Sequence, residues 1–141
     1  MTPDSVFQLA NLSILPAWLL MFVAPGTALT RYVVYSYIYP IALGILYIGL
    51  LAFTFQTGSG DFSSLEGVKQ LFSSEWAVVL GWVHYLVFDM FVGSWELQDS
   101  HKLGISHWLV LPCLFFTLML GPIGLLIYLL LRGVKTGQWS R

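Results

Sequence analysis

The feature that most constrains this chain is an apolar run from Trp76 to Trp95 that contains a histidine, His84, and a carboxylate, Asp89. Twenty helical residues cover about 30 Å, the thickness of the hydrocarbon core of a bilayer. A charge at mid-bilayer costs about 3 kcal/mol on insertion scales, so a polar residue there normally faces the interior of a bundle and is a candidate for function. The run is therefore predicted to be a membrane-spanning helix whose polar side is covered by other helices.

The composition of the whole chain is typical of a membrane protein. Of its 141 residues, 57% are hydrophobic and 9% are charged, whereas a soluble domain carries charge at about a quarter of its positions. A formal net charge of -1 implies neither a nucleic-acid partner nor a polybasic surface for lipid binding. The lone cysteine, Cys113, excludes an internal disulfide bond. We expect a single membrane domain over residues 1–141.

The apolar segments predict an all-α fold, an integral membrane bundle of four transmembrane helices. Each segment is long enough to cross the hydrocarbon core. Pro25 and Gly26 should end the first helix, and Gly121 with Pro122 should kink or locally unwind the fourth. The predicted spans are residues 6–24, 32–55, 76–95 and 107–131.

A polar stretch over residues 56–75 separates the second span from the third. Ser63 followed by Glu66 matches the capping-box pattern, in which a hydroxyl and a carboxylate bond to first-turn amides. Apolar residues then recur at helical spacing from Leu65 to Phe72. We expect a short amphipathic helix lying on the membrane surface.

The orientation follows from the distribution of basic residues. Four spans put both termini and the 56–75 loop on one side of the membrane. The basic residues on the other side are Arg31 and Lys102. Positive charge marks the cytoplasmic side, so we expect cytoplasmic termini. The first segment lacks a preceding basic region and a cleavage site, which favours a retained helix over a signal or transit peptide. The basic residues on the side of the termini are Lys69, Arg132, Lys135 and Arg141.

Aromatic residues at helical spacing form one stripe on the third span. We expect this stripe to line a groove for a long apolar ligand, facing the fourth span near residues 111–118, because aromatic walls bury much area with few rotatable bonds. The stripe consists of His84, Phe88, Phe91 and Trp95.

Asp89 lies on a different face of the same helix, five residues or about 140° from His84. No arginine or lysine lies inside the predicted spans. Asp89 is therefore expected to face the bundle interior and to bond to a neutral group on Asn11, Tyr47 or Thr117.

Four potential metal ligands gather between the third and fourth spans. Their spacing matches none of the recognised zinc or di-iron patterns, so a solvated charge cluster is the favoured interpretation and no metal or cofactor is expected. Phosphate-binding glycine loops, nucleophile elbows and paired cysteines are absent from the sequence. The four residues are Glu96, Asp99, His101 and His107.

The residues that carry a resemblance to a known family are spread over nearly the whole chain. They are Asn11, Pro16, Trp18, Pro25, Tyr47, Trp82 to Glu96, Gly104 to Trp108, Leu111-Pro112, Gly121 to Tyr128 and Arg132. This pattern resembles the abscisic-acid-deficient-four-like family, the relatives of plant neoxanthin synthase. The resemblance implies a carotenoid or another long apolar lipid as partner, and isomerisation of the violaxanthin epoxide to the neoxanthin allene as the activity. The lack of a transit peptide favours a bacterial member in an inner or photosynthetic membrane.

Opening an epoxide to an allenic alcohol involves no net redox change and needs an acid and a base. His84 and Asp89 are the catalytic candidates, although a regular helix cannot direct both at one atom. Simple packing roles for both residues remain open, and Asn11 is more readily explained by a hydrogen bond between helices. The ligand-binding candidates are Asn11, Trp18, Phe88, Phe91, Trp95, His107 and Thr117.

Two other function classes remain open. One is a non-catalytic pigment- or lipid-binding subunit of a larger membrane complex. The other is a small proton or solute conduit that uses Asp89 and His84. A homo-oligomer or an assembly with partner membrane proteins is compatible with each of them.

Overall fold

The computed structural model describes residues 1–57, 60–137 and 139, with the side chains of residues 55–57 left out. Within these residues the fold contains helices and no strand, which confirms the all-α class. The helices are α1 (Pro3–Val23), α2 (Ala28–Val33), α3 (Ile38–Thr57), α4 (Leu65–Leu71), α5 (Glu75–Lys102), α6 (His107–Leu120) and α7 (Pro122–Thr136).

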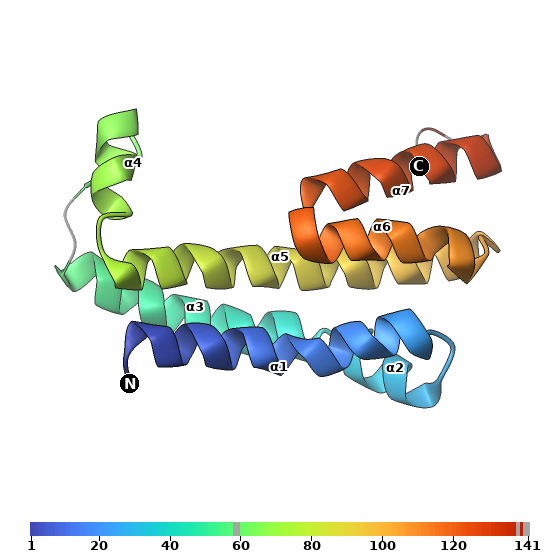
Figure 1. The fold of residues 1–141 in the computed structure, drawn as a ribbon, viewed down its shortest axis with the longest axis horizontal. Coiled ribbons are helices and arrows are strands. Elements are labelled where there is room, and N and C mark those ends of the chain that lie inside the picture. The colour runs from blue at the N-terminus through green and yellow to red at the C-terminus, as the bar shows by residue number, and fades with distance from the viewer. Residues whose placement is uncertain (58–59, 138, 140–141) are drawn as a thin grey trace.

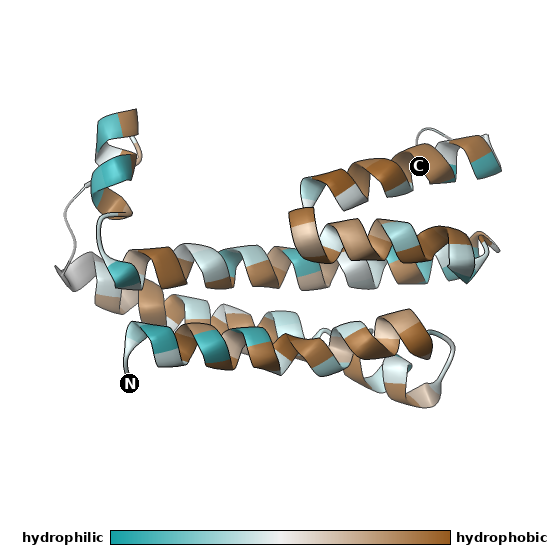
Figure 2. Cartoon of the chain, in the orientation of Figure 1, coloured by the Kyte–Doolittle hydropathy of each residue, from teal (hydrophilic) through white to brown (hydrophobic). Residues whose placement is uncertain are grey.

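The central element is α5, which packs against α1, α3, α6 and α7. Figure 1 shows α1 and α3 each running along α5 in the direction of the long axis. The stretches Pro3–Val23, Ala28–Thr54 and Glu75–Lys102 are long and apolar enough to cross a membrane. They correspond to the first three predicted spans. In Figure 2 hydrophobic residues dominate these helices, whereas hydrophobic and hydrophilic residues alternate along α4.

The predicted fourth span, residues 107–131, is wrong as a single crossing. The chain reverses at Gly121, and α7 runs back along α6 over the same half of α5 (Figure 1). The 14 residues of α6 and the 15 of α7 cover only about 21 and 22 Å each, less than the hydrocarbon thickness. We call the α6–α7 pair the re-entrant hairpin.

The interruption itself lies where it was predicted, but the reversal exceeds a kink. Gly121 has a φ of +47°, a conformation that side chains other than glycine rarely adopt. Pro122 then occupies the first turn of α7, where its missing N–H costs no hydrogen bond. A methyl group at Gly124 would collide with the backbone nitrogen and hydroxyl of Thr117, so the two helices are in direct backbone contact.

The reversal overturns the predicted placement of both termini on one side. Three stretches long enough to cross, followed by the re-entrant hairpin, put the N-terminal and C-terminal ends at opposite ends of the bundle (Figure 1). Arg132 and Lys135 on α7 therefore lie at the end that also holds Arg31 and Lys102. Arg141, which entered the sequence-based argument, lies outside the described residues.

The predicted surface helix is present as α4, which stands across the long axis where α3 ends and α5 begins (Figure 1). Its cap differs from the expected capping box by one residue. Ser64 is the N-cap and accepts a bond from the Gly67 amide at 3.0 Å. Ser63 instead donates to Asp61 at 2.6 Å, which folds the preceding residues into a turn.

Replacing Gly121 with alanine tests the reversal. The positive φ alone costs a residue with a Cβ about 1–2 kcal/mol, and the new methyl group would lie 2.9 Å from Asp89 Oδ1. We expect a lower thermal unfolding temperature in detergent. Gly49→Ala is the matched control, since nothing lies within 4 Å of a methyl group there. Equal unfolding temperatures for the two variants would contradict the described geometry.

Candidate functional site

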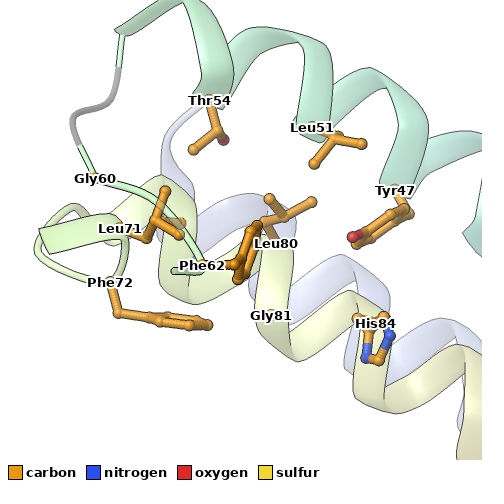
Figure 3. Close-up of a pocket in the computed structure, with 11 residues that line it drawn as sticks. Tyr47, Leu51, Thr54, Gly60, Phe62, Leu71, Phe72, Leu80, Gly81 and His84 are labelled. Carbon is orange, nitrogen blue, oxygen red and sulfur yellow. The ribbon is translucent and has the colours of Figure 1, made fainter. Parts of the chain in front are cut away.

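A pocket of about 410 Å³ lies between α3, α4 and α5. Figure 3 shows side chains from these three helices, and from the segment that leads into α4, converging on one space. Its walls are mainly aliphatic and aromatic. The lining residues are Tyr47, Leu51, Thr54, Gly60, Phe62, Leu71, Phe72, Ala77, Leu80, Gly81 and His84.

Helical spacing explains how two of the helices contribute to this pocket. Tyr47, Leu51 and Thr54 follow one another at four and three residues on α3, so they share one face. On α5, Gly81 lets the Phe72 ring approach the helix backbone, because a methyl group there would lie 2.7 Å from Phe72 Cε1. The α4 end of the pocket is therefore closed by an aromatic ring packed against a glycine.

The polar groups of the pocket are the His84 imidazole, the Tyr47 phenol and the Thr54 hydroxyl. The rings of His84 and Tyr47 face the same space, with centroids 5.7 Å apart (Figure 3). The His84 ring also packs against the Phe88 ring, with centroids 4.8 Å apart. The pocket thus combines apolar walls with groups that can bind a hydroxyl and transfer a proton.

Asp61 fixes the turn that carries Phe62 to the pocket. Its Oδ1 atom accepts bonds from the Ser63 hydroxyl at 2.6 Å and the Ser63 amide at 2.8 Å. These bonds favour the charged form and hold the pKa of Asp61 below its ordinary value. The turn is therefore supported at neutral pH and loses that support as the pH falls through the lowered pKa.

A second polar region lies on the opposite side of α5, under the re-entrant hairpin. Glu96 is fully buried, and both of its carboxyl oxygens lie within bonding distance of the Thr117 hydroxyl, at 2.9 and 3.0 Å. Asp99 accepts from the Tyr128 hydroxyl at 2.8 Å and from Arg132 Nε at 2.9 Å. Carboxyl groups of α5 thus bond to both helices of the hairpin.

Asp89 lies beneath the tip of the re-entrant hairpin with 6% of its surface exposed. It faces the interior as predicted, but its hydrogen-bond partner is Tyr85, one turn earlier, and not Asn11, Tyr47 or Thr117. Its Oδ2 atom is buried with no hydrogen-bond partner among the described residues.

The two catalytic candidates therefore occupy different sites, as the angle between them indicated. His84 is exposed toward the α3–α5 pocket, and Asp89 is buried under the hairpin. No described pocket contains both residues.

The expected groove between the aromatic stripe and the fourth span is wrong, because α6 covers the other face of α5. Phe88 and Phe91 are about half exposed, at 55% and 48%. Phe91 stacks on Tyr37 with ring centroids 5.8 Å apart. Trp95 packs edge-on against Tyr128 of α7, at 5.3 Å.

Three further candidates make contacts that hold α1 in place. Asn11 Oδ1 accepts a bond from Trp82 Nε1 at 2.9 Å, which confirms the expected interhelical hydrogen bond. The fully buried Trp18 packs on Gly93, where a methyl group would lie 2.6 Å from the ring. His107 Nε2 bonds to the Phe22 carbonyl at 2.9 Å.

The residues considered as metal ligands bond to different groups. His101 Nδ1 lies 3.1 Å from the Tyr35 hydroxyl, and Glu96, Asp99 and His107 have the partners given above. Over the described part of the chain, no three histidine, cysteine or acidic side chains come together to hold a metal ion.

Sequence reasoning missed Tyr128 and Arg132 as partners of Asp99. Their spacing of four residues puts both on one helical face, so a shared target could have been inferred. They were missed because Arg132 was placed beyond the end of a crossing helix.

Comparison with known proteins gives a family match. A family model described as ABA DEFICIENT 4-like matches residues 5–128. Protein ABA DEFICIENT 4, chloroplastic, of Arabidopsis thaliana is 31% identical over 147 aligned positions, which cover 97% of this chain. The chain spans 64% of the length of that relative. No solved structure matches.

A double-mutant cycle tests the bond between Thr117 and Glu96. Thr117→Val keeps the side-chain volume but leaves the buried carboxyl without its donor, at an expected loss of about 1–3 kcal/mol in unfolding free energy. Adding Glu96→Met should recover part of that loss, since an apolar pair leaves no unsatisfied group. Losses that simply add, measured by thermal unfolding in detergent, would show that the two side chains do not interact.

Proposed function

The chain belongs to the ABA DEFICIENT 4-like family, and from this premise we propose that it handles a carotenoid or a related isoprenoid in the membrane. The observation that carries the proposal is the α3–α5 pocket, with apolar walls and the titratable His84. A concave apolar site with a few convergent polar groups is the usual form of a small-molecule site.

The size of the pocket indicates how such a ligand binds. Its 410 Å³ lies near the lower end of the usual range for ligand pockets, so it accommodates one end group of a long polyene. The rest of the polyene lies in the bilayer along Phe88 and Phe91, which continue from His84 on α5 and expose half of their surface. Flat aromatic rings contact a polyene at low entropic cost.

The specific reaction proposed is isomerisation of an epoxide end group to an allene. One carbon–oxygen bond of the epoxide breaks, a proton leaves the polyene carbon, and a proton reaches the oxygen, so atoms and electrons balance. His84 is the proposed base, and the Tyr47 hydroxyl the proposed donor to the oxygen. Asp89 lies outside this pocket and is proposed to stabilise the fold.

One observation favours a second candidate, a proton conduit. Asp89, Glu96 and Asp99 all face the re-entrant hairpin, and Asp89 Oδ2 is buried without a partner in the described structure. Buried carboxyls in series are typical of proton relays in membranes. A conduit requires pH-dependent flux in liposomes that Asp89→Asn abolishes.

Charge placement supports a revised orientation. Arg31, Lys102, Arg132 and Lys135 lie at the C-terminal end of the bundle, whereas Lys69 lies at the other. By the positive-inside rule, the C-terminal end faces the cytoplasm or an equivalent compartment and the N-terminus faces away from it. Residence in an inner or photosynthetic membrane of a bacterium stays a prediction.

Expression in a host that makes epoxycarotenoids tests the isomerase. We expect an allenic product from the wild type, and about a hundredfold or greater loss with His84→Gln, since acid–base groups contribute about 10²–10⁴ in rate. Asp89→Asn should retain product, and His101→Gln is the matched control outside the pocket. Pigments are measured by chromatography and mass spectrometry. Pigment bound without chemical change would indicate a binding subunit instead, and full activity of His84→Gln would refute the assignment.

Labelling with a membrane-impermeant maleimide tests the orientation. In a Cys113→Ala background, Asp4→Cys and Lys135→Cys place one thiol at each end of the bundle. We expect the reagent outside intact cells to label Asp4→Cys and to reach Lys135→Cys only after lysis. Labelling of both thiols from one side would restore the four-span topology.

A further inference from the structure

A second pocket of about 380 Å³ opens at the C-terminal end of the bundle. Residues from three elements form it: the junction between α2 and α3, the last turns of α5, and α7. Unlike the α3–α5 pocket, it carries charged side chains. Its lining residues are Tyr37, Trp95, Gln98, Asp99, Lys102 and Arg132.

The charges of this pocket sum to +1, from the cations Lys102 and Arg132 and the anion Asp99. Asp99 accepts bonds from Arg132 Nε and the Tyr128 hydroxyl, which hold the guanidinium at the pocket wall. Lys102 is exposed and makes no ion pair with any residue that the structure describes. The pocket therefore presents to an incoming anion the Arg132 guanidinium, held by Asp99, and the exposed Lys102 ammonium.

The position of this pocket along the bundle determines which anions can reach it. Basic residues gather at this end, so the overall charge of -1 conceals a strong asymmetry. Tyr37 and Trp95 have the amphipathic rings found at headgroup level in membranes. Acidic residues gather at the opposite end of the bundle. They are Asp4 in α1, Asp61 just before α4, Glu66 in α4 and Glu75 at the start of α5.

We propose that this pocket binds the phosphate group of an anionic phospholipid, with Lys102 and Arg132 as its cations. Basic pockets between transmembrane helices on the cytoplasmic side bind acidic headgroups in this way. The volume suits a headgroup, and the Trp95 and Tyr37 rings contact the glycerol and first acyl carbons. A carotenoid has no anionic group, so this site is independent of the proposed activity.

The proposal is tested on the full chain in nanodiscs by native mass spectrometry and thermal unfolding. We expect retention of phosphatidylglycerol and a higher unfolding temperature in that lipid than in phosphatidylcholine. Lys102→Gln should weaken retention at least about tenfold, the usual effect of losing a charge-assisted hydrogen bond. Lys135→Gln is the matched control, because it removes the same charge from the same end outside the pocket.

The outcomes distinguish a phospholipid from free phosphate as the ligand, and the pocket from general surface charge as the binding site. Stabilisation by phosphatidylglycerol that inorganic phosphate does not reproduce supports a lipid site. An equal effect of inorganic phosphate overturns the lipid as ligand, and equal retention of phosphatidylcholine overturns recognition of the anion. If Lys135→Gln weakens retention as much as Lys102→Gln, the general surface charge and not the pocket binds the lipid, and the proposal fails.

Discussion

The need to cover the carboxyl groups of α5 determines the C-terminal half of this fold. Glu96 is fully buried, and Asp89 nearly so, in a helix that is long and apolar enough to cross a membrane. A carboxyl exposed to lipid would be far more costly than one bonded to a hydroxyl. The re-entrant hairpin supplies the Thr117 hydroxyl, the Tyr128 hydroxyl and the Arg132 guanidinium, and its tip covers Asp89. These bonds act together with the apolar core that α5, α6 and α7 share to hold the hairpin on α5.

Hydropathy and length sufficed to predict the three stretches that are long and apolar enough to cross a membrane, because this requirement is local. The break at Gly121 was also predictable from local residue types. Its consequence was not, because a kinked helix and a reversed one share the same Gly-Pro signal. The choice between them depends on contacts far along the chain, such as those of Thr117 with Glu96 and of Arg132 with Asp99. The wrong topology of the termini followed from that single ambiguity.

For the site, helical geometry predicted only which residues of one helix share a face. The angle between His84 and Asp89 on one helix already placed them on different faces. It did not say which neighbour covers each face, so the groove was assigned to α6 although α3 and α4 form the pocket beside His84. Tyr47 was noted as part of the family resemblance, but its place opposite His84 needed the packing of α3 on α5. Residue types thus indicate which chemical groups are present, and the tertiary arrangement decides which of them lie in the same site.

The re-entrant hairpin also has a consequence for biosynthesis. Its connection to α5 and its C-terminal end lie on the same side of the bundle (Figure 1). In the proposed topology, Arg132 and Lys135 do not have to cross the hydrocarbon layer during insertion, because only the three long apolar segments do so. Packing of the last two helices on α5 is also the step that brings Thr117 to Glu96 and buries this carboxyl group.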